Sequence, residues 1–140
     1  MIFTISRTIR FHHCDPAGIV FYPQFFYLLH EAQEDFLAHI GFPQHLLIQR
    51  GVGVPIVDLK TEFLGMCRYG DDVTISLALS RLGNASIGMQ YEINSGQLRK
   101  LKATAVIVYA QVPHGKPVQI PEDLRQALQP YLQNGSRDTA

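Results

Sequence analysis

Residues 12–41 read HHCDPAGIVFYPQFFYLLHEAQEDFLAHIG, a loop followed by one long helix. Proline fixes its own φ angle and disfavours helix in the residue before it, so the segment DPAG at residues 15–18 is predicted to be a shaped loop. Pro23 suits the first turn of a helix, and Gly41 suits the position just past its end. The sequence therefore predicts a helix between Pro23 and Gly41.

Apolar residues recur through this helix at spacings of three and four, the period of a helix with one buried face. They are Phe25, Leu28, Leu29, Ala32, Phe36 and Ile40. Phe26, Leu37 and Ala38 widen the apolar stripe beyond that of an ordinary surface helix. The helix is therefore expected to need cover on most of its sides.

Most of the remaining chain alternates polar and apolar residues, as half-buried strands do. The strands expected are residues 2–10, 52–64, 72–82, 85–93 and 98–112, with short helices at 43–49 and 121–132. Residues 103–110 are apolar on both faces, so that strand should be central or lie at an interface. Short connections between successive strands imply antiparallel pairing. The predicted class is α+β, with a five-stranded antiparallel sheet wrapped around one long central helix.

Composition limits the organisation and the partners of the chain. A chain of 140 residues with 46% apolar residues can form one core, so a single domain is expected over residues 1–133, followed by a disordered tail at 134–140. Twelve lysines and arginines balance twelve acidic residues, so neither nucleic acid nor a membrane is expected as a partner. No signal peptide or spanning segment is evident, and two cysteines are too few for a disulfide framework, so the expected location is cytoplasmic.

The loop before the helix carries the densest set of reactive side chains. Asp15 precedes a helix N-terminus, whose free N–H groups and positive dipole end favour negative charge. The helix end could bind an oxyanion formed from a carbonyl, while the carboxylate attacks that carbonyl or activates a water against it. An aspartate before proline more commonly caps a turn, however, and spacing alone leaves both roles open.

The histidines near this loop do not form a metal-binding pattern. Adjacent residues in an extended segment point opposite ways, so at most one of His12 and His13 faces a pocket that Asp15 also faces. The segment HEAQE at residues 30–34 has glutamate where a zinc-protease helix needs its second histidine. No metal ion or other cofactor is therefore expected.

These residues resemble a known family. The stretch HHCDPAGIVFYPQFFYLLHEA at residues 12–32 is similar to the active-site segment of the 4-hydroxybenzoyl-CoA thioesterase family of hotdog-fold proteins, with DPAGIVFYP as its most specific part. Supporting matches are GVGVPIVDLKTEFL at 51–64, RYGDDVTI at 68–75 and IPEDLRQAL at 120–128. The resemblance covers nearly the whole chain.

The resemblance implies roles for particular residues. The family's catalytic carboxylate, acting as nucleophile or as general base, matches Asp15, and the backbone N–H that polarises the thioester carbonyl matches that of Tyr22. His13 and Gly18 are implied to help form the substrate pocket. The implied reaction is hydrolysis of a small acyl-CoA, with 4-hydroxybenzoyl-type aromatic groups among the candidates, to free acid and CoA.

The resemblance also implies an assembly. Subunits of the family pair so that their sheets run on across the interface, often as a dimer of dimers, which makes a homodimer or homotetramer the expectation here. The active sites then lie at subunit interfaces.

The sequence departs from the family in the hairpin between the third and fourth strands. The members that act on aromatic CoA thioesters carry a run of basic residues there to hold the nucleotide phosphates, whereas residues 81–86 here read RLGNAS. Arg81 and Ser86 are the substrate-binding candidates in this hairpin. Either Arg81 shares the phosphates with another cation such as Arg68 or Lys100, or the nucleotide is held loosely.

Two other functions fit the same fold. A non-catalytic acyl-CoA or acyl-carrier-protein binding module would keep the pocket without turnover, although an intact carboxylate at the helix start argues against it. A hotdog dehydratase would need a histidine and a carboxylate acting beside the thioester, and the loop lacks the proline-flanked histidine of such enzymes. The sequence therefore favours a thioesterase.

Overall fold

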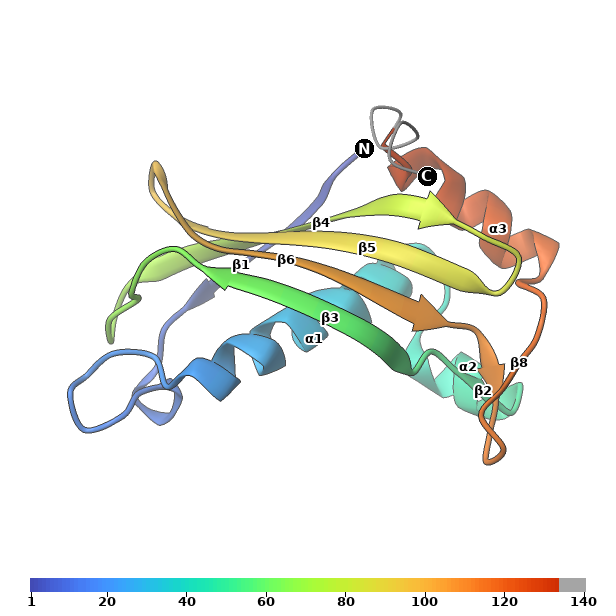
Figure 1. Ribbon diagram of the computed structural model, residues 1–140, viewed down its shortest axis with the longest axis horizontal. Coiled ribbons are helices and arrows are strands. Elements are labelled where there is room, and N and C mark those ends of the chain that lie inside the picture. The colour runs from blue at the N-terminus through green and yellow to red at the C-terminus, as the bar shows by residue number, and fades with distance from the viewer. Residues whose placement is uncertain (134–140) are drawn as a thin grey trace.

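The computed structural model describes residues 1–133 and is built on a five-stranded antiparallel sheet of order β1-β4-β5-β6-β3 (Figure 1). The strands are β1 (Phe3–Thr8), β3 (Ile56–Phe63), β4 (Asp72–Leu82), β5 (Ser86–Ser95) and β6 (Leu98–Val108). The long helix α1 (Tyr22–His39) runs across one face of this sheet. The predicted α+β class, with its five strands and one long helix, is confirmed.

Shorter elements close the ends of the molecule. They are η1 (Phe11–His13), α2 (Gln44–Gln49), β2 (Val52–Gly53), β7 (Ala110–Gln111), β8 (Lys116–Pro117), α3 (Glu122–Leu128) and η2 (Gln129–Tyr131). No helix in the described part of the chain is both long enough and apolar enough to cross a membrane. The predicted tail, residues 134–140, lies outside the described residues.

Two strands predicted as continuous are divided. Strands β2, β7 and β8 form a second, three-stranded sheet, so the single strands predicted at 52–64 and 98–112 are wrong in extent. Pro55 separates β2 from β3, because proline has no N–H to donate to a ladder. Tyr109 alone separates β6 from β7, and its N–H donates to the carbonyl of Ala85 at 2.8 Å.

The core lies between α1 and the sheet. Alternate residues of β4, β5 and β6 are buried, as the period of two predicts. They are Val73, Ile75, Leu77, Leu79, Ile87, Met89, Tyr91, Ile93, Leu101, Ala103, Ala105 and Ile107. Phe36 of α1 is fully buried and packs against the rings of Phe3 and Tyr131, at centroid distances of 5.6 and 4.9 Å. This packing fixes where α1 lies on the sheet.

Within one chain the sheet covers α1 on one side only. The predicted apolar stripe is buried except for the half-buried Ile40, but Tyr27, Glu34 and Ala38 are exposed on the opposite side of the helix. The helix is therefore less enclosed in the single chain than its apolar composition predicts.

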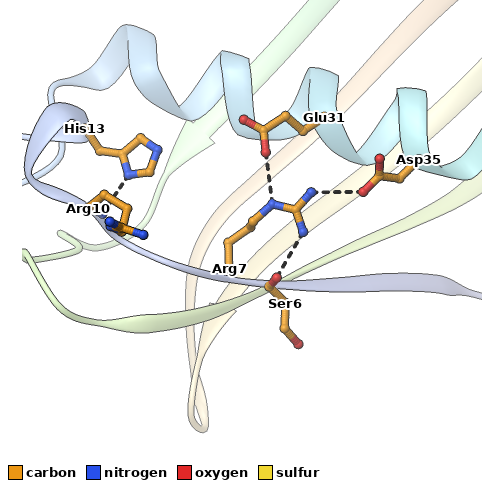
Figure 2. A network of polar contacts seen from close by, with 6 residues as sticks. All are labelled: Ser6, Arg7, Arg10, His13, Glu31 and Asp35. Atoms are coloured by element: carbon orange, nitrogen blue, oxygen red, sulfur yellow. Dashed lines mark hydrogen bonds and ion pairs between the residues drawn. The ribbon is translucent and has the colours of Figure 1, made fainter. Parts of the chain in front are cut away.

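An ion-pair cluster joins α1 to the edge strand β1 (Figure 2). Arg7 donates from Nε to Glu31 and from Nη2 to Asp35, both at 2.9 Å, and from Nη1 to the carbonyl of Ser6 at 3.0 Å. Hydrogen bonds to Glu31 and then to Asp35 raise the pKa of Arg7. Because Glu31 and Asp35 are one helical turn apart, one guanidinium bridges both carboxylates.

Replacing Phe36 by alanine should lower the free energy of unfolding by about 3–5 kcal/mol, because the change removes a fully buried aromatic ring. Urea denaturation followed by circular dichroism at fixed protein concentration measures this. Glu34→Ala, on the exposed side of the same helix, should change stability by less than about 0.5 kcal/mol. Equal effects of the two substitutions would contradict the described core.

Candidate active site

Asp15 lies in a closed loop between η1 and α1. Its N–H donates to the carbonyl of Ile19 and its own carbonyl accepts the N–H of Gly18, both at 2.9 Å. Cys14 and Val20 form an antiparallel bridge beside this pair. Gly18 has a φ of 78°, a conformation that favours glycine over residues with a side chain. The predicted shaped loop is therefore a tight turn that holds Asp15 in place.

Asp15 is half-buried as a residue. Its Oδ1 accepts the N–H of Ala17 at 2.9 Å, as a capping aspartate does in an Asx turn. Its Oδ2 has no hydrogen-bond partner among residues 1–133. Asp15 thus caps the turn and still leaves one carboxylate oxygen for a water or a substrate.

The start of α1 follows this loop directly. Phe21 is the N-cap residue, and its carbonyl accepts the N–H of Gln24 at 2.8 Å. The N–H of Tyr22 has no acceptor within the described part of the chain, and Pro23 has no N–H. A free N–H at the positive end of a helix dipole is suited to a developing negative charge. Figure 1 shows the loop and the helix start at the same end of the molecule.

His13 supports the loop from inside. The residue is 7% exposed, and Nδ1 of its ring accepts the N–H of Arg10 at 2.8 Å (Figure 2). Its carbonyl accepts the N–H of Phe21 at 2.9 Å, so His13 ties the beginning of the loop to its end. Burial, and then the charge of the neighbouring His12, lower the pKa of His13. The neutral form keeps Nδ1 as an acceptor, so this candidate pocket residue acts as a structural anchor in the described chain.

Aromatic residues line the side of the site formed by β3. The ring of Phe63, the last residue of β3, lies 6.2 Å from Tyr22, 6.0 Å from Phe25 and 6.2 Å from Phe26. Thr61, two residues earlier, has a buried hydroxyl without a hydrogen-bond partner in residues 1–133. Sequence reasoning did not select Thr61 or Phe63. Strand alternation was the available signal, because it places both on the side of the strand that faces α1.

A cavity of about 330 Å³ lies between α1 and the start of β3. Its lining is largely apolar and includes Phe26, Leu29, Gln33, Ile56, Leu59 and Tyr91. The cavity therefore extends along α1 from Phe26 to Gln33, away from the Asp15 loop and toward the helix C-terminus.

The two hairpin candidates, Arg81 and Ser86, contact each other. Arg81 donates from Nη2 to the hydroxyl of Ser86 at 2.8 Å across the β4–β5 hairpin. Strand β4 begins beside the Asp15 loop, and Arg81 lies nine residues beyond its first residue, a distance of about 30 Å in an extended strand. One chain therefore does not bring Arg81 and Ser86 to Asp15.

Arg68 is the candidate cation that lies beside the loop. Arg68 forms an isolated antiparallel β-bridge with Ile19 of the loop, and it is exposed to solvent. Lys100 lies farther along the chain and packs on Gly65. No cluster of three or more side chains suited to a metal ion was found among residues 1–133.

A curved antiparallel sheet on one long helix is the fold of the hotdog thioester hydrolases. Residues 9–128 match the family described as the Thioesterase-like superfamily, and the chain belongs to that family.

Relatives of this chain agree with that class. The 1,4-dihydroxy-2-naphthoyl-CoA hydrolase of Thermosynechococcus vestitus is 31% identical over 121 residues, which cover 85% of this chain and 83% of the relative. The 4-hydroxybenzoyl-CoA thioesterase of Pseudomonas sp. (strain CBS-3) is 30% identical over 94 residues, covering 65% and 67%. The solved structure of a gentisyl-coenzyme A thioesterase, BH1999, has a TM-score of 0.81 at 27% identity, covering 90% of this chain and 98% of that one.

The hydrogen bond from the N–H of Arg10 to Nδ1 of His13 predicts that the stability of the folded protein falls in acid. The pKa of His13 is lowered in the folded protein, so the unfolded chain binds this proton first as pH falls. The contribution of His13 to stability should be complete above its ordinary pKa of about 6.5 and decline below it. His13→Asn keeps an acceptor near the position of Nδ1 but does not titrate, so its melting temperature should fall less between about pH 7 and pH 5 than that of the wild type.

His45→Asn, at an exposed histidine of α2, is the matched control and should retain the wild-type pH profile. His13→Leu, which removes the acceptor, should be less stable than His13→Asn at every pH, by about 1–3 kcal/mol. Identical profiles for wild type and His13→Asn would rule out this role of the imidazole.

Proposed function

We propose that this protein hydrolyses a small acyl-CoA thioester to a free acid and CoA, with Asp15 as the catalytic carboxylate. The supporting observation is that Oδ2 of Asp15 and the N–H of Tyr22, both without a partner in residues 1–133, occur at the same end of α1. The relatives named above act on aryl-CoA thioesters, which supports CoA thioesters as the substrates and aromatic acids as the acyl groups.

The chemistry follows from these two groups. The N–H of Tyr22 donates to the thioester oxygen, and the positive end of the helix stabilises the negative charge that develops there. Asp15 either attacks the carbonyl carbon, forming an anhydride that water then hydrolyses, or removes a proton from the water that attacks. In both routes the C–S bond breaks, the thiolate of CoA takes up a proton, and the acyl group leaves as a carboxylate.

Pairing of two chains along β3 is the assembly that fits this surface. Strand β3 bonds to β6 on one side, and its other edge has no strand partner in the described residues. Ile56 and Val57 are 52% and 62% exposed on this strand, and Phe63 is 50% exposed. A free edge with apolar side chains favours association, so antiparallel pairing of two β3 strands would continue the sheet and bury them. A further dimer of dimers stays a prediction from the sequence, as does a cytoplasmic location.

The same pairing relates the two ends of the sheet. An antiparallel twofold partner lies with its Asp15 end toward the Arg81 end of the first chain. Arg81 and Ser86 of one subunit, together with Arg68 of the other, are then the proposed contacts for the nucleotide of CoA. Gly18 would contribute to the substrate pocket indirectly, because its positive φ angle shapes the loop that holds Asp15.

Asp15→Asn should lower the rate of CoA release by at least about a hundredfold, because asparagine neither attacks the carbonyl nor takes the proton from water. Its side-chain oxygen still accepts the N–H of Ala17, so the loop and substrate binding should persist. Free thiol is measured over benzoyl, 4-hydroxybenzoyl, phenylacetyl and short aliphatic CoA thioesters, with binding followed by calorimetry.

Glu34→Gln, at an exposed carboxylate of α1, is the control and should keep wild-type rates. Undiminished turnover by Asp15→Asn would move catalysis to another group. Binding of these thioesters by the wild type without any turnover would indicate a binding module, and hydration of an enoyl-CoA would indicate a dehydratase.

Val57→Lys should convert the dimer to a monomer, because it places a charge from each subunit on the edge that pairs. Sedimentation measures the change, and CoA release should fall with the loss of dimer. Ile48→Lys is the matched control: Ile48 is also an aliphatic residue, 65% exposed, but lies on α2 away from β3. A Val57→Lys protein that sediments like the wild type would refute pairing along β3.

A further inference from the structure

Gln33 is a polar side chain inside an apolar cavity. It is 7% exposed and lies on the α1 side of the cavity of about 330 Å³. Its Oε1 accepts the hydroxyl of Tyr91 at 3.4 Å, a long hydrogen bond, and the same hydroxyl lies 3.3 Å from Sδ of Met89. The amide nitrogen of Gln33 has no partner among residues 1–133. This nitrogen keeps contact with open space, because Thr61 Oγ1 is the only fully buried unpaired side-chain atom among the described residues. It can therefore donate a hydrogen bond to a water or a ligand in the cavity that Gln33 lines.

The size and lining of the cavity suit an acyl group. Its volume is near the lower end of the range for ligand pockets, about 300–1,000 Å³, which is too small for a whole acyl-CoA. Phe26, Leu29 and Leu59 provide apolar walls. Gln33 lies seven residues beyond Phe26 on α1, or about 10 Å along the helix axis. An acyl group in this cavity would therefore pack its body on apolar side chains and present its far end to Gln33.

The thioester of such an acyl group would lie closer to Asp15 and Tyr22 of the opposite subunit than to those of the chain that supplies Gln33. In the same chain, Gln33 lies eleven residues beyond Tyr22, or about 16 Å along α1, which is too far for a one-ring acyl group. Antiparallel pairing along β3 places the start of one β3, where Ile56 lines the cavity, beside the end of the other. That end carries Phe63, which contacts the start of α1.

We propose that Gln33 is a specificity-determining residue that acts on the active site of the other subunit. It selects acyl groups with a hydrogen-bonding substituent, such as a hydroxyl, at the end remote from the thioester, and Asp15 of the opposite subunit hydrolyses the thioester. This inference rests on the proposed thioesterase function. It adds that the preferred acyl group is polar at its far end and that the subunit opposite the catalytic Asp15 recognises this end.

The selectivity is tested with two substrates that differ by one hydroxyl group, 4-hydroxybenzoyl-CoA and benzoyl-CoA. Gln33→Met keeps the length of the side chain but removes its hydrogen-bonding groups. It should lower kcat/KM for 4-hydroxybenzoyl-CoA by about tenfold or more relative to benzoyl-CoA, since a site built to bind a hydroxyl discriminates strongly. Tyr91→Phe should shift the ratio in the same direction. Glu34→Gln, at the next residue but exposed, should leave the ratio unchanged.

The role of the opposite subunit is tested by hybrid dimers of Asp15→Asn and Gln33→Met chains, coexpressed with two affinity tags. A hybrid contains one site that combines an intact Asp15 with an intact Gln33 from the other chain, so it should regain wild-type preference for 4-hydroxybenzoyl-CoA. A hybrid with the preference of the Gln33→Met homodimer would overturn the proposal, because Gln33 would then serve its own chain. Full activity of the Asp15→Asn homodimer would instead overturn the thioesterase mechanism.

Discussion

Packing of α1 against the sheet is the interaction on which the rest of the structure depends. Phe36 and the buried residues of β4, β5 and β6 fix the helix along the sheet, and Arg7 fixes the same helix to β1. With the helix fixed, its first N–H groups can occur only at one end of the sheet, where the loop returns from β1. The cavity then follows the same helix toward its middle. One packing arrangement therefore sets the positions of the carboxylate, the free N–H and the cavity.

Much of this could be predicted from residues whose signal is local. The DPAG loop, the helix after it and the alternation of β4 all follow from backbone preferences or periodicity, and all were found. The division at Pro55 was missed because the apolar pattern continues across the proline while the backbone changes sheets. Gln33 was not selected either, although it is four residues beyond Leu29 and so interrupts the apolar stripe. Its importance depends on Tyr91, 58 residues away.

Asp15 shows why spacing alone could not decide between two roles. Capping a turn uses one oxygen of the carboxylate, and the proposed catalysis uses the other, so the two roles are compatible. The turn also orients the side chain without a charged partner among residues 1–133. The sequence predicts that Arg81 lies in a hairpin, but it does not predict how far Arg81 lies from Asp15. That separation depends on the length and direction of β4.

The alternation of β3 has a consequence for assembly. Leu59, Thr61 and Phe63 share one face of the strand, while Asp58, Lys60 and Glu62 share the other. In the proposed pairing of two β3 strands, a slip of one residue would place the charged face of one strand on the same side of the sheet as the apolar face of the other. In the proposed dimer, the same eight residues would therefore favour pairing in one register and disfavour pairing one residue out of it.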